Sequence, residues 1–152
     1  DPYISDEKAK SLNIERTNLV NLFTNCDVIS NHLPDIPETY AILNYDLFSK
    51  MKSFSTFINT GRGRQVIEED LCRAMQEDIT RTALLDVTFP EPPESTSPLL
   101  KTENIIITPH IAGSLGNEIE RLSEYMLEEA LRYIKGEDCK YEINSNMLKN
   151  MA

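Results

Sequence analysis

The chain has 152 residues, 40% of them hydrophobic and 26% charged, and its formal net charge at pH 7 is −10. These values are typical of one globular domain with a sizeable core. The acidic balance, with no basic run to offset it, argues against a nucleic-acid or anionic-membrane surface. No apolar run approaches membrane-spanning length. Three widely spaced cysteines predict reduced thiols in a cytoplasmic protein and no metal site.

Strand and helix signals alternate along the chain. Short β-rich or continuously apolar runs predict strands at Cys26–His32, Ser55–Thr60, Thr82–Thr88 and Asn104–Ile111. Apolar residues at helical spacing predict helices at Tyr40–Met51, Ile67–Asp78 and Asn117–Lys135. Gly136 is the expected C-cap of the last helix. The alternation predicts an α/β fold with a parallel Rossmann-like sheet and flanking helices.

Polar residues follow all four predicted strands. They are His32, Arg62, Asp86 with Glu91, and His110, in strand order. Parallel sheets bind ligands beyond the carboxyl ends of their strands, and these ends share one edge of the sheet. We therefore expect a binding or catalytic site at that edge.

A histidine and a carboxylate are expected to meet there. Pro109 holds the backbone before His110 extended, and Glu91 lies in the loop that leaves the neighbouring strand. A carboxylate hydrogen-bonded to one ring nitrogen fixes the tautomer and stabilises the protonated ring, so the pair could exchange a proton. Alone, His110 would more often be a structural residue, and Glu91 a solvated loop acid.

Arg62 adds a permanent charge between two glycines of a strand-to-helix turn. The simpler alternative is a surface arginine. Beside a histidine and a carboxylate, a guanidinium can grip a carboxylate in bidentate fashion and polarise an adjacent carbonyl. The three side chains suit a 2-oxo or 2-hydroxy acid. Since none of them can carry a hydride, a nicotinamide is the natural cofactor.

Four stretches, "HLPDIPET", "FINTGRG", "LLDVTFPEPP" and "IIITPHIAGS", resemble the motifs of the D-isomer-specific 2-hydroxyacid dehydrogenase family, in its order and spacing, over residues 1–136. The resemblance implies an oxidoreductase that interconverts a D-2-hydroxy acid and a 2-oxo acid with NAD(H) and is a homodimer at full length. It makes Arg62 the substrate-carboxylate arginine, Glu91 the acid that pairs with the histidine, and His110 the general acid/base.

The resemblance also implies a cofactor site. Asp86 would contact the nicotinamide carboxamide, and Asp1 would hold the adenosine ribose and favour NAD over NADP. Gly61 stands where many members have Ala or Ser, which leaves the turn intact. The residues expected at the cofactor are Asp1, His32, Leu33, Pro34, Thr39, Thr60, Gly61, Arg62, Asp86, His110 and Gly113.

One family motif does not occur in these residues. There is no G-x-G-x-x-G, so we expect the pyrophosphate-binding turn and the first two strands of the domain to be missing. Those strands are central in the doubly wound order. Ser11–Asn18, which resembles the short third strand, would lose its neighbour, and Cys26–His32 would present an unpaired edge. Residues 1–136 would be a partial NAD-binding domain, and 137–152 a tail toward the absent substrate domain.

Two functional hypotheses follow. The first is a fragment of an NAD-dependent 2-hydroxyacid dehydrogenase; the second is a nucleotide-sensing binding or regulatory module of the same fold without turnover. Arg62, Glu91 and His110 together favour the enzyme, since a sensor does not need all three. Because the glycine-rich turn is missing, we expect the isolated chain to bind NAD weakly and to be inactive. The identity of the acid stays open.

Overall fold

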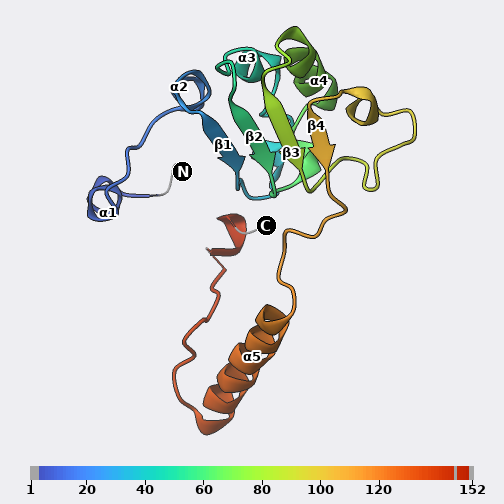
Figure 1. Cartoon of the computed structure of the whole chain (residues 1–152). Coiled ribbons are helices and arrows are strands. Elements are labelled where there is room, and N and C mark those ends of the chain that lie inside the picture. The colour runs from blue at the N-terminus through green and yellow to red at the C-terminus, as the bar shows by residue number, and fades with distance from the viewer. Residues whose placement is uncertain (1–3, 146, 151–152) are drawn as a thin grey trace.

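A parallel sheet forms the centre of the computed structural model, which describes residues 4–145 and 147–150 (Figure 1). Its four strands lie in chain order, and every neighbouring pair is parallel. Their bounds are Val28–Asn31 for β1, Thr56–Asn59 for β2, Thr82–Leu85 for β3 and Ile105–Ile107 for β4. The predicted α/β fold is confirmed, and each strand lies inside its predicted range.

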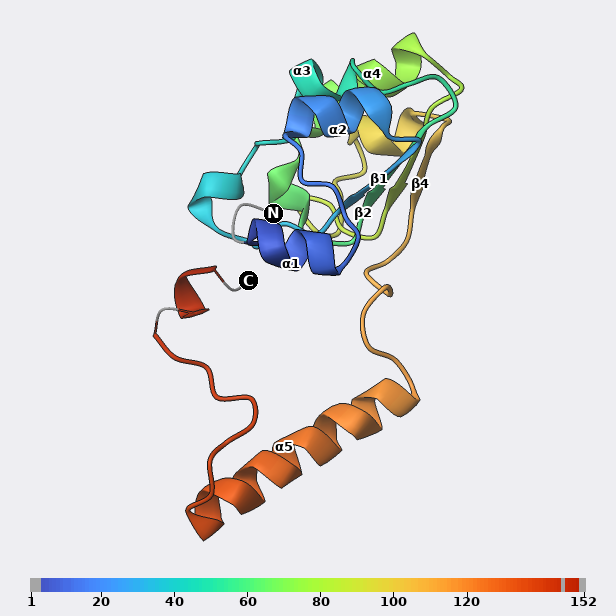
Figure 2. The same cartoon turned by 90° about the vertical axis from the view of Figure 1, so that its left-hand side faces the viewer.

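Helices cover one face of this sheet. They are α2 (Leu19–Asn25), α3 (Tyr45–Phe48) and α4 (Glu68–Glu77), and Figures 1 and 2 show them on the same side of the strands. Alternate strand side chains point into this layer. Ile29 and Phe57 are therefore buried, whereas Val28 and Ile106 on the opposite face are 60% and 54% exposed.

Three aromatic rings join the helices to the strands. Phe23 of α2, Phe48 of α3 and Phe57 of β2 are each at most 1% exposed. The Phe48 ring meets the other two nearly at right angles, with centroids 5.6 Å from Phe23 and 5.1 Å from Phe57. Edge-to-face pairs of this kind contribute about 0.5–1.5 kcal/mol beyond their burial. They hold α2 and α3 against the sheet.

The segment Ser11–Asn18 was predicted to be a short strand, and this prediction is wrong. Helix α1 (Asp6–Ser11) ends within it, and the chain then runs without regular structure until Asn18 caps α2. A strand needs a neighbour to pair its backbone groups. Within the described residues, β1 is the edge of the sheet and offers none beyond it. The unpaired edge expected at β1 is thus observed.

The predicted helix at Tyr40–Met51 is wrong in its first part. The 3₁₀ turn η1 (Pro37–Thr39) comes first, and only Tyr45–Phe48 form the helix α3. Between them Leu43 is extended and bridges to Val66, donating from its N–H to the Gln65 carbonyl at 2.9 Å. This backbone is therefore committed to the segment after β2 and cannot form helical hydrogen bonds.

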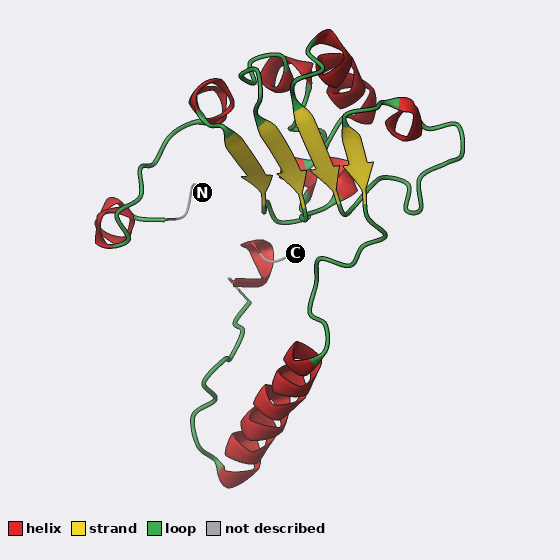
Figure 3. Ribbon diagram, viewed as in Figure 1, coloured by secondary structure: helices red, strands yellow, loops and turns green. Residues whose placement is uncertain are grey.

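The last helix, α5 (Asn117–Lys135), has its predicted bounds. Gly136 ends it with a left-handed φ of 69°, which confirms the expected C-cap. Figure 3 shows α5 extending away from the sheet, after which the chain turns back toward the sheet and ends in the turn η4 (Met147–Asn150). No residue of α5 is buried. None of the helices in the described part of the chain is long and apolar enough to cross a membrane.

A buried arginine lies at the amino end of the sheet and binds the carbonyls of the segments around it. Arg81, 9% exposed, donates from Nη1 to the Ala74 carbonyl at 3.0 Å and from Nη2 to the carbonyls of Met51 at 2.5 Å and Ser49 at 3.2 Å. These carbonyls lie in α4 and in the turn after α3, where helix ends lack intrahelical partners. One guanidinium therefore joins both helices to β3.

We expect Arg81→Met to lower the free energy of unfolding by about 2–4 kcal/mol, because three buried carbonyls lose a charged donor. Urea denaturation measures the change. The control is Arg121→Met on α5, where a 60% exposed side chain lies 3.9 Å from Glu118, and we expect a loss below about 0.5 kcal/mol. Equal effects of the two substitutions would contradict this role of Arg81.

Candidate functional site

The loops that follow β2 and β3 touch at the carboxyl end of the sheet. Gly63 lies so close to the next loop that an added Cβ would stand 2.1 Å from the Thr88 carbonyl carbon and 2.2 Å from its oxygen. Only a residue without a side chain fits there. This contact places Arg62, which precedes Gly63, beside the loop that carries Glu91.

Glu91 and His110 form a hydrogen-bonded pair. The Nδ1 atom of His110 lies 2.6 Å from Oε1 of Glu91, and the two side chains are 50% and 40% exposed. His110 has a left-handed backbone with φ 54°, which is rare for a residue other than glycine. The surrounding structure must hold this conformation.

The carboxylate of Asp86 forms the hydrogen bonds that hold the backbone around His110. One carboxylate oxygen, Oδ1, accepts from the Thr108 hydroxyl at 2.5 Å and from the Ile111 N–H at 2.8 Å, and Oδ2 accepts from the Ala112 N–H at 2.8 Å. Burial alone would raise the pKa of Asp86, but these hydrogen bonds outweigh it and lower the pKa. An ionised Asp86 at the end of β3 therefore shapes the segment that presents His110.

Arg62 and Glu91 share a small cavity. It has a volume of about 360 Å³, and Asp35, Arg64, Thr88 and Phe89 line it with them. The Arg62 side chain donates from Nη1 to the Gly61 carbonyl at 2.8 Å. Among the residues that the structure describes, it forms no ion pair, so its charge is available to an anion entering the cavity.

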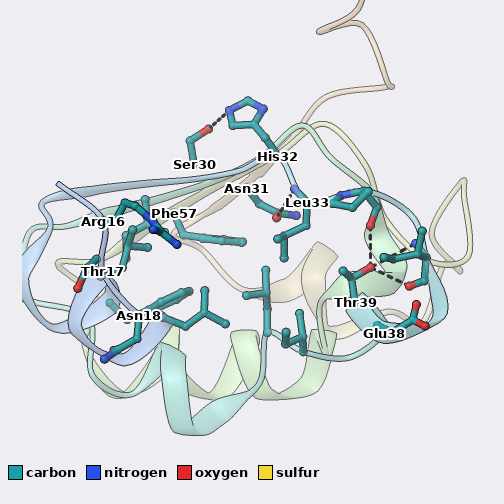
Figure 4. Close-up of a pocket in the computed structure, with 18 residues that line it drawn as sticks. Arg16, Thr17, Asn18, Ser30, Asn31, His32, Leu33, Glu38, Thr39 and Phe57 are labelled. Atoms are coloured by element: carbon teal, nitrogen blue, oxygen red, sulfur yellow. Dashed lines mark hydrogen bonds between the residues drawn. The ribbon is translucent and has the colours of Figure 1, made fainter. Parts of the chain in front are cut away.

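A larger cavity of about 1170 Å³ lies beside β1 (Figure 4). Four of the residues that line it were predicted to lie at the cofactor, namely His32, Leu33, Pro34 and Thr39. In Figure 4 the His32 ring lies against Ser30, with Nε2 2.7 Å from Oγ. The Thr39 hydroxyl is buried and 2.7 Å from the Pro34 carbonyl oxygen. The cavity exceeds the roughly 300–1,000 Å³ of typical ligand pockets.

Of the other described residues predicted at the cofactor, Arg62 lines the smaller cavity, and Thr60, Gly61, Asp86, His110 and Gly113 line neither. Thr60 and Gly61 form the turn after β2, and Gly113 is exposed in the segment after β4. Asp86 faces the 108–112 segment, and Asp1 lies outside the described residues. The structure thus places Arg62 and Glu91 around one cavity, with His110 hydrogen-bonded to Glu91, and four of the residues predicted at the cofactor around another.

Three buried amides at the site were not predicted. Asn31 and Asn59 end β1 and β2 at paired positions, and Gln65 lies in the 3₁₀ turn η2 (Gly63–Gln65). The Asn31 Nδ2 atom donates to Oδ1 of Asn59 at 2.9 Å and to Oε1 of Gln65 at 2.5 Å. The sequence does contain a signal for this cluster, because two successive predicted strands each have an asparagine near their carboxyl end.

Fold and strand-end loops define a nucleotide-binding α/β domain, and comparisons with known proteins give its family. Residues 1–112 match the family described as D-isomer specific 2-hydroxyacid dehydrogenase, NAD binding domain. Glyoxylate reductase from Thermofilum pendens is 35% identical over 90% of this chain and 40% of its own length. D-3-phosphoglycerate dehydrogenase 2, chloroplastic, from Arabidopsis thaliana is 32% identical over 97% of this chain and 24% of its own.

Comparison with solved structures indicates the same family. A probable 2-hydroxyacid dehydrogenase from Rhizobium etli CFN 42, in complex with NADP, HEPES and L(+)-tartaric acid, superposes with a TM-score of 0.70 at 33% identity, over 86% of this chain and 43% of that one. The chain belongs to the D-isomer-specific 2-hydroxyacid dehydrogenase family, and residues 1–112 match the NAD-binding domain of that family. It spans 24% and 40% of the lengths of the two curated relatives above.

The contact at Gly63 generates a stability prediction. We expect Gly63→Ala to lower the free energy of unfolding by about 2 kcal/mol or more, because its methyl group would overlap the Thr88 backbone. Gly113→Ala is the matched control, since its methyl group would meet no atom within 4 Å, and we expect no loss there. Thermal and urea denaturation of both variants measure the difference. A fully stable Gly63→Ala protein would contradict the close approach.

The lowered pKa of Asp86 gives a pH prediction. Because its folded pKa lies below the unfolded value, its stabilisation is present above about pH 4 and is lost as the pH falls through the folded pKa. We expect Asp86→Asn to lose about 1–3 kcal/mol at pH 7 and to show a shallower decline below pH 4. Urea titrations across this range, with the exposed Asp138→Asn as control, measure both effects. If the free energy of unfolding of Asp86→Asn fell below pH 4 as steeply as that of the parent protein, this role of Asp86 would be contradicted.

Proposed function

We propose that this chain is part of an oxidoreductase that interconverts a D-2-hydroxy acid and a 2-oxo acid with NAD(H). The observation that carries the proposal is the 2.6 Å contact between His110 and Glu91, next to a cavity that Glu91 shares with Arg62. A proton-transfer pair beside an available guanidinium suits a substrate with a carboxylate and an adjacent carbonyl or hydroxyl group.

In this proposal His110 is the general acid/base. Its Nδ1 atom is occupied by Glu91, so Nε2 is the ring nitrogen left to face the oxygen on C2 of the substrate. When a 2-oxo acid is reduced, Nε2 donates its proton to the carbonyl oxygen, which becomes the hydroxyl; in oxidation, Nε2 takes that proton back. The Glu91 carboxylate orients the ring and stabilises its protonated form.

Arg62 binds and orients the substrate. A guanidinium can form two parallel hydrogen bonds to a carboxylate, which fixes both position and direction. The same charge favours electron density that develops on the neighbouring C2 oxygen. Since Gly63 packs against the Thr88 backbone, the loop that carries Arg62 lies directly against the loop that leads to Glu91, the partner of the proton donor His110.

The residues of the larger cavity fit part of a dinucleotide. Leu33 and Pro34 offer an apolar wall, and the Thr39 hydroxyl holds this loop through the carbonyls of Pro34 and Ile36. We assign these residues to the cofactor with His32, Thr60 and Gly61. When bound, NAD(H) gives or takes the hydride at C2. Backbone donors of a G-x-G-x-x-G turn for the pyrophosphate are not among the 152 residues.

We also propose a cytoplasmic homodimer for the complete protein, with residues 1–136 as partial cofactor domain and 137–152 leading to a substrate domain. Cys26, Cys72 and Cys139 are all unpaired, which suits a reducing compartment. Ile119, Leu122 and Met126 of α5 are more than half exposed, which suits a helix that packs on another domain or subunit.

Turnover by the natural full-length protein tests the proposal. NADH oxidation is followed with a panel of 2-oxo acids that includes glyoxylate and hydroxypyruvate. We expect His110→Ala to lower kcat about 10²–10⁴-fold, because the C2 oxygen loses its proton donor. The control His32→Ala removes the other histidine, and we expect it to change NADH affinity rather than kcat. Full activity of His110→Ala would overturn the assignment, and NADH binding without turnover in the parent would favour a regulatory module.

A further inference from the structure

We propose that Gln65 is a positioning residue for Arg62 and acts through a buried amide cluster with Asn31 and Asn59. The inference rests on the proposed function, in which Arg62 grips the substrate carboxylate. All three amides are buried, with exposed fractions of 5% for Asn31, 1% for Asn59 and 0% for Gln65. They lie beneath the turn that carries Arg62.

The cluster holds both backbone polar groups of Arg62. Its N–H donates to Oε1 of Gln65 at 3.3 Å, and its carbonyl accepts from Nδ2 of Asn59 at 3.2 Å. The carbonyl also accepts from the Gln65 backbone N–H at 3.4 Å within the 3₁₀ turn, so Gln65 and Asn59 together orient the backbone of Arg62. The oriented backbone fixes where the Arg62 side chain starts, and Nη1 is held further along by the Gly61 carbonyl at 2.8 Å.

Gln65 also fixes this turn to the preceding loop. Its Nε2 donates to the carbonyls of Leu33 at 2.8 Å and Pro34 at 2.9 Å. Asn31 completes the connection by accepting from the Leu33 N–H at 3.2 Å. One side chain thus ties the Arg62 turn to the loop that lines the larger cavity.

Gly61 provides an independent sign that the cluster and the turn are fitted together. A Cβ at position 61 would lie 3.0 Å from both Asn31 Nδ2 and Gln65 Oε1, closer than side chains normally approach. The amides therefore fill the space under the turn. Apolar side chains could fill it without the need to satisfy every buried amide group. The polar cluster is best explained by the hydrogen-bonding geometry that it imposes on Arg62.

Steady-state kinetics of the full-length protein with its best 2-oxo acid test the proposal. Gln65→Met keeps the volume but removes the amide, and we expect KM for the acid to rise about tenfold or more as the guanidinium loses its placement. Asn104→Leu is the matched control, since Asn104 donates to two backbone carbonyls, those of Met75 and Arg81, at the other end of the sheet. We expect it to lower Tm and leave KM within twofold.

A double-mutant cycle separates positioning from general stability. If Gln65 acts through Arg62, Gln65→Met should change KM less than twofold in an Arg62→Ala background. The proposal would be overturned if Gln65→Met raised KM by the same factor with and without Arg62. It would also be overturned if Gln65→Met alone left KM unchanged. If Gln65→Met does not fold, Asn31→Ser takes its place: it removes the three side-chain hydrogen bonds of Asn31 but leaves the bonds from Gln65 and Asn59 to the Arg62 backbone, so we expect a smaller rise in KM. A normal KM in Arg62→Ala alone would instead refute the proposed function at Arg62.

Discussion

Parallel pairing of the strands is the constraint on which the site depends. In a parallel sheet every strand runs toward the same edge, so each loop after a strand starts beside the others. The register places Asn31 beside Asn59 at the ends of β1 and β2. Residues separated by many positions in sequence, such as Arg62, Glu91 and His110, therefore lie on neighbouring loops. No single loop contains the proposed chemistry.

The sequence predicted what depends on local pattern. Apolar runs located all four strands, and apolar spacing with a terminal glycine located α5. It failed where a segment's structure is decided by a distant partner. Leu43 is extended because it pairs with the backbone after β2, and residues 11–18 have no strand to join. Helical spacing and β propensity cannot register such contacts, since propensity is a weak prior that tertiary pairing overrides.

The candidate site was predicted in its charged members and missed in its neutral ones. Charged groups at strand ends are unusual enough to be noticed, and the loop order suggested that Glu91 would reach His110. Asn31 and Gln65 look like ordinary polar residues in sequence. Their importance arises from hydrogen bonds between loops more than thirty residues apart, which exist only once the strands are in register.

The open edge of β1 has a consequence for the behaviour of the chain in solution. An edge strand displays unpaired N–H and carbonyl groups that can template pairing with another copy, and the exposed Val28 adds an apolar contact. The net charge of −10 opposes this approach by mutual repulsion. Salt screens such repulsion beyond a distance of about 8 Å at physiological ionic strength. Repulsion between copies therefore weakens as the ionic strength rises, so pairing at the β1 edge is less strongly opposed in concentrated salt than in dilute buffer.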